Sequence, residues 1–204
     1  MDKNRQWEIW DKQTVKRALK LWGGVDNTRG RHWSLLRKIS DLIPEDVSVL
    51  EVAPGMGHLY YMIKDRVKSY LGLDTSVDMV NQFHEFFPDA DVRIGDAFHL
   101  EEEPSVEVVV NVDMLMHIPG ELAVIEYLIK QMYDKAEKKL IFTLRMTDGD
   151  SRYTSRKIRP DSDKRVTYRA VSYDDFYKLM LRLHIYNIIE VVHDSRTSIW
   201  VVTK

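Results

Sequence analysis

A short apolar run that ends in an acid and breaks into a glycine turn constrains this chain more than any other feature. It reads Val47-Ser-Val-Leu-Glu-Val-Ala-Pro-Gly-Met-Gly-His58, and a segment with helical spacing follows it. Gly55 and Gly57 allow a tight backbone turn and leave no Cβ in the way of a ligand. The amide groups at the start of the next helix then face that ligand. The pattern predicts a strand, a turn and a helix that together bind a nucleotide-like molecule.

Three further apolar runs carry polar residues at their ends. The first ends at Asp74 and is followed by a helix-like segment, the second contains Asp96, and the third covers residues 106–113. The third run is rich in β-branched residues, as expected of a strand that is buried on both faces. Ligands of parallel sheets bind at the carboxyl ends of the strands, where an acid can bind a ribose diol. We therefore expect these polar groups to meet at one edge of a parallel sheet.

In order and spacing, these segments resemble the class I S-adenosylmethionine-dependent methyltransferases over roughly residues 45–146. The resemblance implies a Rossmann-like α/β fold with a seven-stranded, mostly parallel sheet, helices on both faces and an antiparallel last strand. It also implies S-adenosyl-L-methionine as the cofactor. The family usually has a glycine where this chain has Ala53, which narrows the turn. The implied cofactor-binding residues are Glu51, Ala53, Pro54, Gly55, Gly57, Asp74, Thr75, Met79, Asp96, Ala97, Asn111 and Val112.

Two other classes compete with this interpretation. A nicotinamide-binding Rossmann domain needs a third glycine so that its helix can approach the strand, and this chain has Tyr60 there. A cofactor-binding fold that has lost catalysis and serves as a partner subunit is the other class. The complete set of Gly55, Gly57, Asp74 and Asp96 disfavours it without removing it.

The length of 204 residues predicts one domain. Its expected parts are a helical N-terminal cap (1–43), a cofactor-binding core (44–146), a substrate-side loop (147–170) and a C-terminal helix with a hairpin (171–204). The cap holds four of the five tryptophans, and helical spacing predicts helices at about 4–22 and 29–43. Further helices are expected at about 57–67, 76–87 and 119–136, and a capping box opens another at Ser172.

Cysteine is absent, which excludes disulfides and thiolate chemistry. The first residues show no apolar signal core, and no run approaches the roughly 18 apolar residues of a membrane span. We therefore expect a cytoplasmic protein without a membrane partner. The sequence does not predict an oligomeric state.

Charge is distributed unevenly along the chain. Residues 1–43 carry a net +5 and residues 147–170 a net +3, whereas residues 44–146 carry −10. This asymmetry fits either complementarity between cap and core or an entrance that attracts anions. A pI near 6.4 disfavours a nucleic-acid partner. The favoured acceptor is a small molecule that is methylated at oxygen or nitrogen. If the basic segments form an entrance that attracts anions, this acceptor is anionic. A methyltransferase acting on RNA or protein stays open as the alternative.

His117 follows the fourth expected strand and is the candidate general base. The ordinary pKa of histidine lies close to neutral pH, and a positioned base contributes typically ~10²–10⁴-fold. The alternative role is structural, with His117 only shaping its loop. Asp113 and His117 have the spacing of a helical metal-ligand pair, but two ligands are too few for a dedicated site. No metal is therefore expected.

Overall fold

The computed structural model describes residues 15–16, 19, 24–25, 31–157, 165–194 and 196–204. The helix predicted for residues 4–22 lies outside the described residues except at 15, 16 and 19. The tryptophans at 7, 10 and 22 also lie outside them. Among the described residues, no helix combines the length and the apolar character that crossing a membrane requires.

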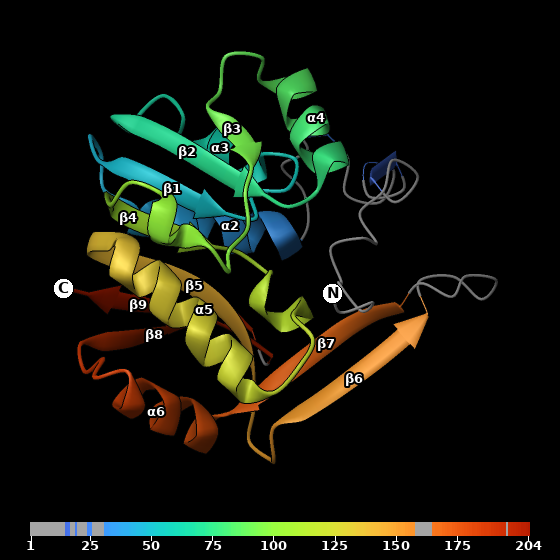
Figure 1. Ribbon diagram of the computed structural model, residues 1–204, viewed down its shortest axis with the longest axis vertical. Helices are drawn as coiled ribbons and strands as arrows, with labels where there is room; N and C mark the ends of the chain where they lie inside the picture. Colours follow the sequence, from blue (N-terminus) through green and yellow to red (C-terminus); the bar gives the residue numbers. More distant parts are fainter. Residues whose placement is uncertain (1–14, 17–18, 20–23, 26–30, 158–164, 195) are drawn as a thin grey trace.

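A twisted nine-stranded sheet organises the molecule (Figure 1). Its parallel part has the order β3-β2-β1-β4-β5, and β9 lies antiparallel between β5 and β8. The predicted Rossmann-like fold with antiparallel strands at the end of the chain is confirmed. The strands are β1 (Ser48–Val52), β2 (Ser69–Asp74), β3 (Val92–Ile94), β4 (Val106–Asn111), β5 (Ala136–Thr147), β6 (Arg152–Lys157), β7 (Arg165–Ser172), β8 (Ile188–Val192) and β9 (Thr197–Thr203).

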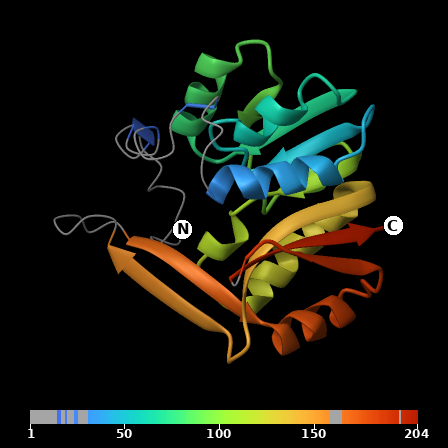
Figure 2. The same cartoon turned by 180° about the vertical axis from the view of Figure 1, so that it is seen from behind.

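The predicted count of seven strands was wrong, because the segment expected to be a loop at 147–170 supplies two more. There β6 and β7 pair as an antiparallel hairpin, and β7 joins the carboxyl end of β5 in parallel through Met146 opposite Val171 and Thr147 opposite Ser172. Both views show this hairpin reaching away from the sheet (Figures 1 and 2). The sequence did not predict these strands, because apolar and polar residues do not alternate clearly along either of them.

Helices cover both faces of the sheet. The helices α5 and α6 lie on one face, and α2 and α3 lie on the other (Figures 1 and 2). The helices and short 3-10 turns are α2 (Arg31–Leu42), α3 (His58–Ile63), α4 (Val77–Phe86), η2 (Leu100–Glu102), η3 (Leu115–His117), α5 (Leu122–Lys135) and α6 (Tyr173–Arg182).

Two helix starts test the sequence signals. The helix start predicted at Ser172 is confirmed, because the Ser172 hydroxyl accepts the backbone N–H of Asp175 at 3.1 Å. The reciprocal bond of a capping box is not formed, since the Ser172 N–H donates to Ser151 Oγ at 2.8 Å. The helix predicted from residue 119 starts three residues later, at Leu122. Gly120 has a φ of 103°, a conformation outside the helical region, and Glu121 takes the capping position. Pro119 therefore belongs to the loop.

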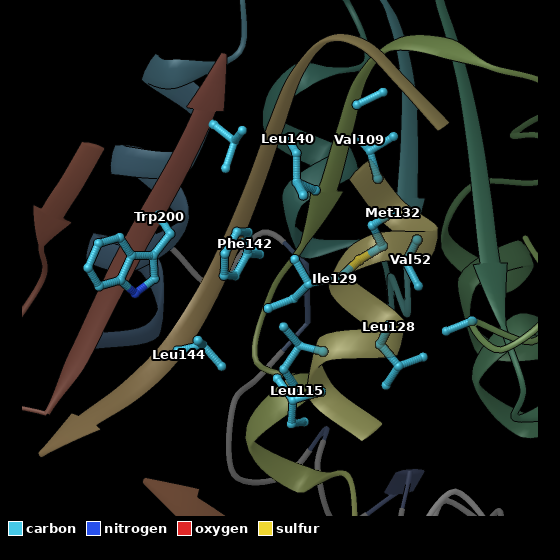
Figure 3. Packing of buried hydrophobic residues seen from close by; sticks show 14 of the residues in the cluster. Val52, Val109, Leu115, Leu128, Ile129, Met132, Leu140, Phe142, Leu144 and Trp200 are labelled. Carbon is cyan, nitrogen blue, oxygen red and sulfur yellow. The ribbon is translucent and has the colours of Figure 1, made fainter. Parts of the chain in front are cut away.

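The core lies on both faces of the central strands. Val108, Val109 and Val110 of β4 are at most 1% exposed, as predicted for a strand covered on both sides. On the face of α5, side chains from β4, β5, α5 and β9 interdigitate (Figure 3). This support holds the carboxyl ends of β1, β2 and β4 in register, which is where the polar residues lie.

A cluster of aromatic rings underlies the glycine turn. The Tyr60 ring centroid lies 4.5 Å from that of Tyr70, 5.4 Å from that of Phe83 and 5.0 Å from that of Phe87. A Cβ built on Gly57 would approach ring atoms of Phe83 at 2.8 Å and of Phe87 at 2.9 Å. The missing side chain at Gly57 thus lets the turn sit on these rings. Tyr60 occupies the place that a third glycine would leave open.

Gly57→Ala should therefore destabilise the protein. Overpacking against Phe83 and Phe87, combined with the left-handed backbone at a φ of 86°, should lower the free energy of unfolding by about 2–4 kcal/mol. Urea unfolding measures this loss. Gly149→Ala is the matched control, because a Cβ there meets nothing within 4 Å. Equal stabilities of the two variants would contradict the role assigned to the aromatic cluster.

Candidate active site

The glycine turn joins β1 to α3 through three residues in the left-handed backbone region. Ala53, Gly55 and Gly57 have φ values of 59°, 57° and 86°. For Ala53 this conformation costs roughly 1–2 kcal/mol. Its N–H donates to the Leu73 carbonyl at 2.7 Å, which ties the turn to β2 and offsets part of that cost. The departure from the family's usual glycine is thus accommodated within the same backbone shape.

Gly55 and Gly57 serve different purposes. A Cβ built on Gly55 meets nothing within 4 Å, whereas one on Gly57 runs into rings. Gly55 therefore borders open space, whereas the missing side chain of Gly57 lets the rings of Phe83 and Phe87 pack against the turn. Of the two glycines, only Gly55 has the exposed approach expected of a backbone that contacts a ligand.

Asp74 connects the end of β2 to the glycine turn. Its carboxylate accepts the Gly55 N–H at 3.1 Å on Oδ2 and the Ser76 N–H at 2.9 Å on Oδ1. Burial raises the pKa of Asp74 to about 6, although hydrogen bonds from Ser76, Gly55 and Thr75 favour the charged form. The group is a buried acceptor at the edge where the turn opens.

Glu51 and Asn111 add two more buried polar side chains beside Asp74. The Tyr70 hydroxyl donates to Glu51 Oε2 at 2.7 Å, and burial raises the pKa of Glu51 to about 7. Asn111 Nδ2 donates to the Val52 carbonyl at 2.8 Å, while its Oδ1 is buried without a hydrogen-bond partner among the described residues. A buried acceptor without a partner indicates a place for an additional donor.

The remaining cofactor-binding candidates lie around this edge in differing environments. The Asp96 carboxylate accepts the Phe98 N–H at 3.0 Å, which closes a turn after β3. Met79 is buried against Met56 and Val15, so the described part of the N-terminal segment covers the glycine turn. Of the other cofactor-binding candidates, Pro54 and Ala97 are buried, and Thr75 and Val112 are half-buried.

His117 ends η3 and lies against the hairpin. Its ring meets the Tyr168 ring edge-on, with the centroids 5.1 Å apart. On Tyr168, the guanidinium carbon of Arg145 lies 5.5 Å from the ring centroid. The structure thus brings His117 together with β5 and β7, at the end of β5 where the two strands pair.

A second polar cluster was missed by sequence reasoning. Asp113 has a left-handed φ of 59°, its N–H donates to Thr143 Oγ1 at 2.7 Å, and its carboxylate lies 3.9 Å from His32 Nδ1. Burial lowers the pKa of both His32 and His58, that of His58 to about 4. Nothing in the local sequence joins Asp113 to His32, because α2 precedes β4 by more than sixty residues.

An arginine-lined cavity of about 250 Å³ lies between β5, the hairpin and the turn before β9. The sequence indicated excess positive charge in residues 147–170 but not this convergence. The cavity needs the hairpin, because strand pairing places Arg152 opposite Ala170 and Thr154 opposite Tyr168. Its lining residues are Arg145, Met146, Arg152, Thr154, Tyr168, Arg169, Ala170 and Arg196.

Solved structures share this architecture. DhpI in its SAH complex is 14% identical, has a TM-score of 0.76, and the match covers 96% of this chain and 93% of that one. The magnesium protoporphyrin IX methyltransferase ChlM from Synechocystis PCC 6803, with bound SAM, is 13% identical, has a TM-score of 0.71, and the match covers 97% and 94%. The glycopeptide N-methyltransferase MtfA is 15% identical, has a TM-score of 0.62, and the match covers 82% and 88%. At these identities, the likeness concerns the fold.

The sequence itself decides the family. Residues 49–139 match a family model described as "Methyltransferase domain". The chain contains a methyltransferase domain, and its fold is that of S-adenosylmethionine-dependent methyltransferases. The matched residues run from β1 into β5 and include the glycine turn, Asp74, Asp96 and His117 of this methyltransferase. No curated protein matches the sequence.

The methyltransferase should lose stability as pH rises through the range in which Glu51 ionises. The pKa of Glu51 is about 7 in the fold, against an ordinary 4.5, so the stabilising protonated form is fully present below pH 4.5 and lost near pH 7. The free energy of unfolding should fall by up to about 3 kcal/mol across that interval. Glu51→Gln should flatten this dependence in urea unfolding at several pH values. Glu45→Gln, at an exposed position, is the control and should leave the slope unchanged.

Proposed function

We propose that this chain transfers the methyl group of S-adenosylmethionine to an oxygen or nitrogen of a small anionic acceptor. The observation that carries the proposal is the placement of Glu51, Asp74 and Asn111 at the carboxyl ends of the neighbouring strands β1, β2 and β4, where Asp74 bonds the open backbone of Gly55. These groups present hydrogen-bond acceptors at the carboxyl edge of a parallel sheet, where ligands of such sheets bind.

The hydrogen-bonding groups at this edge of the sheet suit S-adenosylmethionine. Asp74 would accept from the ribose hydroxyls, and Asn111 Oδ1 and Glu51 offer buried acceptors for an ammonium group. Asp96 and Ala97 would border the adenine, with Pro54, Thr75, Met79 and Val112 completing the surrounding wall. When bound, S-adenosylmethionine supplies a methyl group that its sulfonium makes electrophilic. The net charge of −10 on residues 44–146 favours a cationic ligand.

His117 would accept the proton that the acceptor releases. In this role a ring nitrogen of His117 would take the proton from the O–H or N–H whose heavy atom bonds to the methyl carbon, while the bond from that carbon to sulfur breaks and its electron pair stays on sulfur. Tyr168 keeps the imidazole oriented through the edge-on contact at 5.1 Å. Fixed orientation is the main contribution, since positioning of reacting groups supplies about 7–11 kcal/mol in favourable cases.

An anionic acceptor is supported by the basic hairpin beside His117. Arg152 and Arg169 lie on β6 and β7, and Arg145 approaches the same Tyr168 ring that contacts His117. An acceptor drawn toward these guanidinium groups would arrive next to the proposed base. The pI of 6.4 keeps this attraction local, because the molecule as a whole is slightly negative.

Asp74→Ala should weaken S-adenosylmethionine binding. Loss of a charged acceptor for two hydroxyls should cost about 1.5–3 kcal/mol, measured by calorimetry at pH 7.5. Native affinity should also fall as pH drops below about 6, where Asp74 becomes protonated. Asp89→Ala, at an exposed position, is the control. Unchanged affinity in a folded Asp74 variant would refute the assignment, and tight NADH binding would favour the oxidoreductase class.

His117→Ala should slow the chemical step by ~10²-fold or more while cofactor affinity stays near native. The measurement is single-turnover transfer of a labelled methyl group, using an acceptor found by screening small carboxylates and phosphates. His99→Ala, an exposed histidine after β3, is the matched control. A native single-turnover rate in the His117 variant would leave that residue with only a structural role.

A further inference from the structure

We propose that the cavity between β5, the hairpin and the turn before β9 binds an oxyanion, a phosphate or carboxylate group, through Arg145, Arg152 and Arg196. The inference rests on the proposed function, because it assigns this cavity to the charged end of the methyl acceptor. The four arginines of the lining come from three separate parts of the chain.

No carboxylate in the described part of the chain neutralises the guanidinium groups of Arg145, Arg152 and Arg196. Within the described residues, no carboxylate lies within 4.0 Å of the side-chain nitrogens of Arg145, Arg152 or Arg196. The lining itself contains no acid. Like charges repel in a shared cavity, so an arrangement of this kind becomes favourable when an anion enters it. Arginine is suited to that task because its planar fork matches the oxygens of carboxylate and phosphate.

Arg169 provides a second, independent indication. It is only 7% exposed, and its terminal nitrogen donates to the Gly120 carbonyl while its guanidinium lies 5.3 Å from the Tyr153 ring centroid. Its Nε is nevertheless buried without a hydrogen-bond partner among the described residues. A buried guanidinium N–H without an acceptor is costly, and a bound oxyanion at the cavity would supply one.

Tyr168 places the cavity next to the proposed reaction centre. Its ring contacts Arg145, with 5.5 Å to the guanidinium carbon, and His117, with 5.1 Å between ring centroids. The cavity of about 250 Å³ is smaller than the roughly 300–1,000 Å³ typical of sites that enclose a whole ligand. It therefore fits the anionic end of an acceptor, whose nucleophilic atom would extend past Tyr168 toward His117.

This arrangement defines the acceptor class. The substrate carries an oxyanion group at one end and a hydroxyl or amino group at the other, separated by a spacer that reaches across one aromatic ring. A neutral molecule would leave the arginines without an anionic counter-charge.

Inorganic phosphate and acetate are the probes, titrated separately into the full-length protein at constant ionic strength. Calorimetry should show saturable binding of at least one of them, which distinguishes phosphate from carboxylate recognition. The double variant Arg152→Gln/Arg196→Gln should weaken that binding at least tenfold, because both side chains lie on exposed segments where folding tolerates the change. The charge-matched control Arg37→Gln/Arg182→Gln, on α2 and α6, should bind like the native protein.

Other outcomes would overturn the inference. These are no saturable binding of either anion, equal loss in the control variant, or tighter arginine-dependent binding of a short single-stranded RNA. Titration of S-adenosylmethionine in the same samples separates this inference from the proposed function. Anion binding without cofactor binding would overturn the proposed function and leave the anion site standing. Cofactor binding and methyl transfer without anion binding would overturn the anion site and leave the proposed methyl transfer standing.

Discussion

The carboxylate of Asp74 is the interaction on which the rest of the site depends. It accepts N–H groups from Gly55 and Ser76, so one side chain fixes the glycine turn, the end of β2 and the start of α4 relative to each other. These hydrogen bonds hold the charged form in place although burial raises the pKa. Because Glu51 lies close by and is also buried, the core concentrates negative charge that a cationic ligand would stabilise.

The hairpin of β6 and β7 supplies the opposite charge. Through Tyr168 it reaches His117, and through Arg169 it reaches the loop before α5. In the proposed function, cofactor recognition and acceptor recognition are thereby separated in space and in sign of charge. We infer that the uneven charge along the sequence reflects an acidic core that binds the cofactor and a basic hairpin that binds the acceptor. Charge complementarity between cap and core is then a secondary effect.

The sequence predicted the strands and the glycine turn of the parallel half of the sheet well because their signals are local. A glycine turn after an apolar strand, acids at strand ends and a β-branched run each depend on a few consecutive residues, and β1, β2 and β4 lie where these patterns place them. The hairpin was not predictable in this way. Its strands contain arginine, threonine and tyrosine on both faces, so pairing with β5 decides their structure.

The site shows the same contrast. Asp74 and Gly55 meet as expected, whereas the pairing of Asp113 with Thr143 and His32 depends on contacts distant in sequence. Gly57 was expected to make room for a ligand, and the structure shows that its missing Cβ makes room for Phe83 and Phe87. A glycine in a motif specifies a missing Cβ, and only the surrounding structure tells which neighbour needs that space.

The hairpin is attached to the sheet through only two register pairs, Met146 with Val171 and Thr147 with Ser172. Substitutions further along β6 and β7 therefore disturb few contacts of the buried core. Under the proposed function, mutations in the hairpin can therefore change acceptor selectivity while the glycine turn and Asp74 stay intact.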